Sequence, residues 1–136
     1  MDIEEVGALL YWCEGSKRED DRRVEFVNSD PKMVAVFMKY IRAKGVDEGR
    51  LRIRLGIHVQ DNERECKKYW MGVTGLSDSN FISTVVKGHS LCRKPLPHGT
   101  VTIRYNSLAL LREIKNEISV MAEGLAQCRI PAAALL

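Results

Sequence analysis

A single carboxylate, Glu14, follows an apolar stretch and directly precedes a glycine. The sequence VGALLYWCEGS, residues 6–16, predicts a helix that is apolar on almost every side and ends at Gly15, which we expect in the left-handed conformation. A carboxylate at the C-terminal end of a helix is poorly placed, because the helix dipole puts partial negative charge at the same end. A cation beside Glu14 would resolve this conflict. The alternative is a buried N-terminal helix whose last side chain is a solvated glutamate.

A second candidate site is a strand that carries arginines on one side. The sequence RLRIRLGIHVQ, residues 50–60, alternates strictly between apolar and polar side chains, which predicts a strand with one buried face. Its polar face carries Arg50, Arg52, Arg54, His58 and Gln60. Neighbouring arginines repel each other unless anions or carboxylates lie across them, and arginine binds phosphates and guanine edges in bidentate fashion. The alternative is an edge strand whose charges protect against aggregation.

Charge is unevenly distributed along the chain, although the net charge is only +3. Acidic residues dominate residues 2–21, whereas no acid occurs between Asp78 and Glu113. The basic residues of that second segment are Lys87, Arg93, Lys94, Arg104 and Arg112. One side of the fold should therefore be electropositive, as in proteins that bind phosphates. The alternative is an ordinary solvated loop.

Length and composition predict one soluble domain. The chain has 136 residues, of which 45% are hydrophobic, and no run approaches the roughly 20 apolar residues of a membrane span. Its N-terminus, MDIEEV, is acidic and unlike a signal peptide, so we expect a cytoplasmic location. The four cysteines are widely spaced and are expected to be reduced thiols rather than zinc ligands.

Hydrophobic periodicity and turn residues predict the order helix, strand, helix, strand, helix, strand, strand, helix. The expected strands cover residues 23–29, 50–60, 81–86 and 100–107. The later helices should begin after Asp30, after Asp61 or Asn62, and after Asn106 or Ser107. The sequence predicts a basic loop at residues 87–99. It also predicts one domain over residues 1–125 and a loosely packed tail at residues 126–136.

Residues 7–15 resemble the LAGLIDADG motif of homing endonucleases and their relatives. The match places the small packing positions on Gly7, Ala8 and Leu9, the metal-binding acid on Glu14, and the terminal glycine on Gly15. It departs from the motif because Leu9 is larger than usual, Trp12 stands at the first acid position, and glutamate replaces aspartate at residue 14. The segments VEFVNSDPKMVAVFMKYI, GLSDSNFI and GTVTIRY also resemble compact LAGLIDADG-like domains of bacteria and archaea, so that the resemblance spans residues 6–118.

The resemblance implies an α+β fold in which helices cover one face of an antiparallel sheet and the other, basic face meets DNA. It also implies a homodimer through the first helix, with Gly7, Ala8, Leu9 and Tyr11 at the interface. The helix between the arginine strand and Phe81 departs from the plainest αββαββα arrangement of this fold, which leaves the strand pairing open.

For the activity, the resemblance implies a magnesium-dependent DNA endonuclease acting on a near-palindromic site. Glu14 and the backbone carbonyl of Cys13 would bind the metal, and Lys87 would assist catalysis. The DNA contacts would come from Arg50, Arg52, Arg54, His58, Arg93, Lys94 and Arg104. Two alternatives stay open: a DNA-binding or regulatory module of the same fold that does not cleave, and a structural domain whose basic strand binds an acidic protein.

Overall fold

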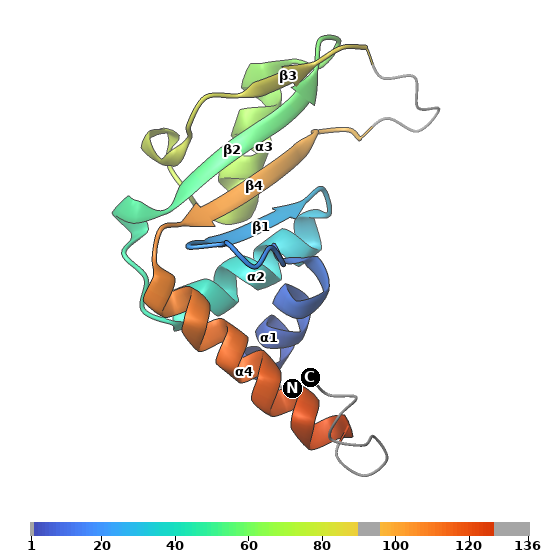
Figure 1. Ribbon diagram of the computed structural model, residues 1–136. Helices are drawn as coiled ribbons and strands as arrows, with labels where there is room; N and C mark the ends of the chain where they lie inside the picture. Colours follow the sequence, from blue (N-terminus) through green and yellow to red (C-terminus); the bar gives the residue numbers. More distant parts are fainter. Residues whose placement is uncertain (1, 90–95, 127–136) are drawn as a thin grey trace.

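The computed structural model describes residues 2–89 and 96–126 and has the predicted order of helices and strands (Figure 1). The helices are α1 (Ile3–Glu14), α2 (Pro31–Ala43), α3 (Glu63–Thr74) and α4 (Leu108–Ala126). The strands are β1 (Val24–Asn28), β2 (Arg52–His58), β3 (Val85–Lys87) and β4 (Thr100–Tyr105). Two short 3-10 helices, η1 (Glu48–Arg50) and η2 (Asp78–Asn80), precede β2 and β3.

The four strands form one sheet in the order β1-β4-β2-β3. Strand β4 pairs antiparallel with both β1 and β2, but β2 pairs parallel with β3. The prediction of an antiparallel sheet was therefore wrong, and the sheet is mixed. The reason is α3, because a helix between two strands returns the chain to the end at which the first strand began.

The predicted strand at residues 81–86 is shorter than expected and begins later. Only Val85–Lys87 forms β3, whereas Phe81 makes a single parallel bridge with Ile53. The chain before it is held as a turn by Asn80, whose buried amide donates hydrogen bonds to the carbonyls of Glu48 and Leu51.

Helices α2 and α3 cover one face of the sheet, and the core lies between them and the strands (Figure 1). The buried face of β2 carries Ile53, Leu55 and Ile57, and the preceding Leu51 is also buried, as the alternating sequence predicts. Trp70 of α3 and Phe37 of α2 are fully buried, and the Phe37 ring stacks on Phe26 of β1. Helix α1 packs against α2 and α4, and the opposite face of the sheet carries no helix from the described part of the chain. We call this second surface the open face.

Gly15 ends α1, but it does so in an extended conformation with φ −75°. The prediction of a left-handed residue at this position was wrong. Glycine is needed here for space, because a Cβ on residue 15 would lie 2.6 Å from the ring of Tyr11. That close approach lets the Tyr11 hydroxyl accept a hydrogen bond from the backbone N–H of Glu25, which joins α1 to β1.

Two further predictions concern the chain's relation to membranes and its C-terminal end. No helix in the described residues is long and apolar enough to cross a membrane. Helix α4 continues to Ala126, and the rest of the tail expected at residues 126–136 lies outside the described residues.

Candidate nucleic-acid interface

Strand register aligns the arginines of the open face in rows across the sheet. Glu25, Arg104 and Arg52 are paired across β1, β4 and β2, and Thr102 and Arg54 are paired one row further along. Paired residues on neighbouring strands project from the same side of a sheet. The face predicted for the arginines of β2 is therefore confirmed, and Arg104 of the adjacent strand joins them.

The arginines of β2 have no carboxylate partner among the described residues. Arg52 donates through Nη1 to the backbone carbonyls of Gly49, at 2.7 Å, and Leu51, at 2.8 Å. Arg54 makes no ion pair in this part of the chain, and its buried Nε has no hydrogen-bond partner. The carboxylate of Glu25 instead forms an ion pair with Arg104, whose Nε lies 3.3 Å from Oε1. No carboxylate of residues 2–89 or 96–126 therefore pairs with the positive charge of Arg52 and Arg54 in the middle of the open face.

Arg50 extends this block beyond the end of the strand. The residue lies in η1 rather than in β2, where the alternating sequence predicted it. Its Nη2 donates to the backbone carbonyl of Asn106, and its guanidinium lies 4.7 Å from the centre of the Tyr105 ring. These contacts hold an exposed guanidinium at the end of the sheet where β4 finishes.

Lys87 and His58 are paired in the β2–β3 register, at the opposite end and edge of the sheet. His58 Nδ1 lies 3.9 Å from a carboxylate oxygen of Asp61, and Lys87 is exposed. Strand β3 is an edge strand, so Lys87 lies at the margin of the sheet rather than near its centre. Because two strands separate β3 from β1, Lys87 does not meet Glu14 within one chain. Arg93 and Lys94 lie outside the described residues.

Glu14 lies beside β1, at the margin of the open face. The segment after α1 is held there by an isolated bridge between Gly15 and Phe26 and by the Ser16 N–H, which donates to the Glu25 carbonyl at 3.0 Å. Glu14 is exposed and makes no ion pair with any described residue. It lines an open hollow of about 380 Å³, which we call the β1-edge hollow. The other lining residues are Gly15, Ser16, Arg18, Arg23, Glu25, Val27 and Arg104.

One chain does not assemble a ligand set for a divalent metal ion in its described part. No group of three or more His, Cys, Asp or Glu residues is placed to hold one in residues 2–89 and 96–126. Glu25 shares the β1-edge hollow with Glu14, but it is engaged with Arg104 and Arg23. The Cys13 carbonyl, the other predicted ligand, accepts a hydrogen bond from Lys17 at 3.4 Å. A metal at Glu14 would need ligands from a second chain or from DNA.

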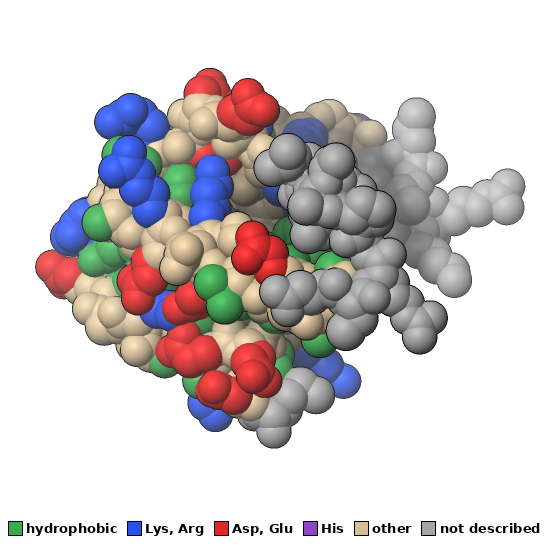
Figure 2. All heavy atoms as spheres, turned by 60° about the horizontal axis from the view of Figure 1, so that its bottom comes forward, with side chains coloured by type: hydrophobic (Ala, Val, Ile, Leu, Met, Phe, Trp, Pro, Cys, Tyr) green, Lys and Arg blue, Asp and Glu red, His purple; other side chains and the backbone are tan. Residues whose placement is uncertain are grey.

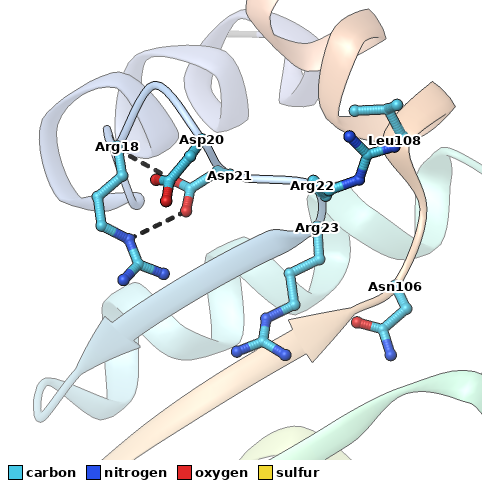
Figure 3. Close-up of a pocket in the computed structure, with 7 residues that line it drawn as sticks. All are labelled: Arg18, Asp20, Asp21, Arg22, Arg23, Asn106 and Leu108. Carbon is cyan, nitrogen blue, oxygen red and sulfur yellow. Dashed lines mark hydrogen bonds and ion pairs between the residues drawn. The ribbon is translucent and has the colours of Figure 1, made fainter.

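A second polar hollow, of about 470 Å³, opens where the turn after α1 meets the start of α4 (Figure 3). Within it Asp21 accepts hydrogen bonds from the Ser16 hydroxyl at 2.5 Å and from the Arg18 backbone N–H and Nε. The Ser16 hydroxyl and, less strongly, Arg18 hold the pKa of Asp21 below its ordinary value, although burial opposes them. The sequence SKREDDRR was interpreted only as a charged turn, since nothing in it marks Asp21 as the buried acid.

The small residues of α1 pack against other helices of the same chain. Gly7, Ala8 and Tyr11 are buried, and Gly7 lies directly against the Tyr40 ring of α2. The close helix approach expected at Gly7 and Ala8 between two chains therefore takes place within one. Leu9, which is 49% exposed, and Trp12, which is 45% exposed, remain available on the outside of α1.

An apolar groove of about 850 Å³ runs between α1 and α4. Its apolar lining includes Val6, Leu9, Val120, Met121 and Leu125, and its rim includes Glu4, Glu5 and Glu117. Figure 2 views the molecule from the side of these helices: red acidic side chains gather near the centre, and blue basic side chains gather at the left.

Comparisons with protein-family models, with curated proteins and with solved structures find no match to this chain. The support for a function therefore comes from the open face, the β1-edge hollow and the apolar groove.

Proposed function

We propose that the chain is a DNA-binding protein of the LAGLIDADG type that lays its open face on duplex DNA. The observation that carries this proposal is the set of guanidinium groups on that face without carboxylate partners among the described residues, above all Arg52 and Arg54. Arginines at one face are costly in the free protein because they repel one another, and phosphates would offset that repulsion. Arg50 and Arg104 extend the same surface, and His58 and Lys87 lie at its far end.

A homodimer belongs to this proposal. Leu9 and Trp12 are exposed on α1, and the neighbouring groove is largely apolar, so a second copy would remove this surface from water. A two-fold dimer would present two open faces to a near-palindromic DNA site. Sedimentation tests it: we expect a dimer at tens of micromolar, and we expect Leu9→Glu to yield a folded monomer.

Metal-dependent cleavage is a second candidate function, favoured by the position of Glu14. Its carboxylate is exposed and forms no ion pair with a described residue. It lies at the margin of the proposed DNA surface. Because one chain offers no complete ligand set in its described part, cleavage would require the dimer and the phosphate oxygens of DNA as well. Incubation of a plasmid library with Mg²⁺ separates a nuclease, which nicks it, from a module that only binds.

Duplex binding is tested by fluorescence anisotropy of a labelled 20-base-pair duplex at salt concentrations from 50 to 200 mM. We expect the logarithm of the association constant to fall linearly with the logarithm of salt concentration. The double variant Arg52→Gln/Arg54→Gln should make that slope shallower by about 2, at about 0.9 for each phosphate contact. The matched control Arg112→Gln/Lys115→Gln removes two exposed charges from α4 and should leave the slope unchanged.

A further variant separates loss of contact from loss of folding. Arg54→Met removes a guanidinium whose buried Nε has no hydrogen-bond partner, so its melting temperature should equal or exceed that of the parent. Its duplex affinity should nevertheless fall. Full duplex affinity in the Arg52/Arg54 double variant would remove the open face from consideration as the binding surface. Absence of salt-dependent duplex binding by the parent would favour the acidic-protein alternative.

A further inference from the structure

Three arginines from three separate segments line the β1-edge hollow. Arg18 belongs to the turn after α1, Arg23 precedes β1, and Arg104 lies on β4. Figure 3 shows Arg18 and Arg23 extending away from Arg22, which reaches toward Leu108 at the start of α4. The hollow adjoins the open face through Arg104, which occupies the same row as Arg52.

Each of these guanidiniums is held by a carboxylate through Nε. The Nε of Arg18 lies 3.2 Å from Asp21, that of Arg104 lies 3.3 Å from Glu25, and that of Arg23 lies 3.5 Å from Glu25. The terminal Nη groups of the three arginines make no hydrogen bond with a described residue. Tethering through Nε restricts each side chain while leaving its two terminal nitrogens available to donate, and a fork of this kind is suited to phosphate oxygens.

We infer that the β1-edge hollow is a binding site for one phosphodiester group of the DNA backbone, held by Arg18, Arg23 and Arg104. This inference rests on the proposed function. It adds a DNA contact beside β1 to those of Arg52 and Arg54 on β2. Together with Asp21, which pairs with Arg18, the lining carboxylates of Glu14 and Glu25 balance the three guanidiniums. The attraction for a phosphodiester therefore comes from the terminal guanidinium nitrogens, which donate to no described residue, rather than from a net positive charge. An open hollow also suits a group that continues into a polymer on both sides.

The site is tested first with the duplex. The double variant Arg18→Gln/Arg23→Gln should make the salt slope shallower by about 0.9, because its two arginines share one phosphate. The control Arg112→Gln/Lys115→Gln loses as much charge on α4 and should keep the parent slope. Since Arg18 also holds Asp21, each variant is first shown by thermal melting to be folded under the binding conditions. If the folded Arg18→Gln/Arg23→Gln variant has the same salt slope as the parent, the inference is overturned. If the slope of Arg52→Gln/Arg54→Gln is nevertheless reduced, the proposed function is retained.

Inorganic phosphate provides a test that does not depend on DNA. We expect it to shift the side-chain Nε–Hε resonances of Arg18, Arg23 and Arg104 more than that of Arg112, compared with chloride at equal ionic strength. Equal shifts at all four arginines overturn the inference. Selective shifts without any duplex binding would retain the hollow as a phosphate site and reject the proposed function instead.

Discussion

The backbone of Gly7 lies directly against the ring of Tyr40, so that a Cβ on residue 7 would overlap Cγ and Cδ1 of that ring. Tyr40 is fully buried and cannot move outward without opening the contact between α1 and α2. The small residue at position 7 is therefore needed to fold a single chain.

Gly7→Ala should lower the free energy of unfolding by about 1 to 3 kcal/mol, the usual cost of overpacking a core. The matched control is Gly72→Ala in α3, where an added Cβ meets nothing within 4 Å. That variant should be neutral or more stable by up to about 1 kcal/mol, because alanine is the better helix former. Urea denaturation measures both, and equal stability of the two variants would contradict the packing argument.

Lys44 joins three helices through its ammonium group. Its side chain is 5% exposed and pairs with Glu4 of α1 and Glu117 of α4, while the Tyr40 hydroxyl donates to Glu117 at 2.7 Å. Lys44→Met should cost about 2 kcal/mol, because the carboxylates of Glu4, Glu113 and Glu117 would face one another without a cation. Their partial exposure keeps the cost below that of a fully buried pair.

The control for Lys44 is Lys39→Met, which changes an exposed lysine of α2, the helix that ends directly before Lys44. Adding Glu117→Gln to Lys44→Met should recover part of the lost stability, since it removes one of the repelling charges. Additive effects of the two changes, measured by chemical denaturation, would show that Lys44 and Glu117 are not coupled.

Asp21 should contribute to the pH dependence of stability. Its pKa in the folded protein lies below the ordinary value of 3.8, mainly because the Ser16 hydroxyl donates to the carboxylate. The stabilisation is therefore present above the unfolded-state pKa and is lost as the pH falls through the folded-state pKa. Asp21→Asn should be less stable than the parent by about 1 kcal/mol at pH 7, and the difference should shrink below about pH 4. Thermal melts at several pH values measure this stability difference, and Asp20→Asn, which changes an exposed acid, is the control.

Local sequence patterns predicted the elements and the faces of the strands. The alternation from Leu51 to Ile57 identified the buried side of β2, and Asp30 followed by Pro31 located the start of α2, where Asp30 caps the helix. These features depend on neighbours in the sequence. The pairing of β2 with β3 depends instead on the path through α3, and no local pattern in residues 81–87 distinguishes a parallel from an antiparallel partner.

The sequence indicated the face on which single residues of the candidate site lie, but not how residues of different segments are grouped. Arg52 and Arg54 lie on one face as expected, whereas the grouping of Glu14 with Arg104 and Glu25 arises from the pairing of β1 with β4 and the bridge at Gly15. The packing of Gly7 was ambiguous for the same reason. A small residue signals a close approach, but its sequence context does not say whether the neighbour belongs to the same chain.

Glu14 provides the sharpest test of what the β1-edge hollow does. Its carboxylate shares that hollow with three guanidiniums, and it would repel a phosphate bound there. Glu14→Gln keeps the size of the side chain and removes the charge. Duplex affinity should therefore stay equal or rise up to about fivefold, corresponding to about 1 kcal/mol for one charge near a phosphate in a solvated site.

The same variant decides between binding and cleavage. If the protein nicks DNA with Mg²⁺, Glu14→Gln should abolish nicking while retaining the duplex affinity, because a neutral amide is a poor ligand for a hard cation. Exposed Glu19→Gln, which removes a nearby acid outside the hollow, should affect neither property. Nicking by Glu14→Gln at the parent rate would exclude Glu14 as a metal ligand. Tighter binding without nicking in either protein would identify Glu14 as a carboxylate that limits DNA affinity in a module that only binds.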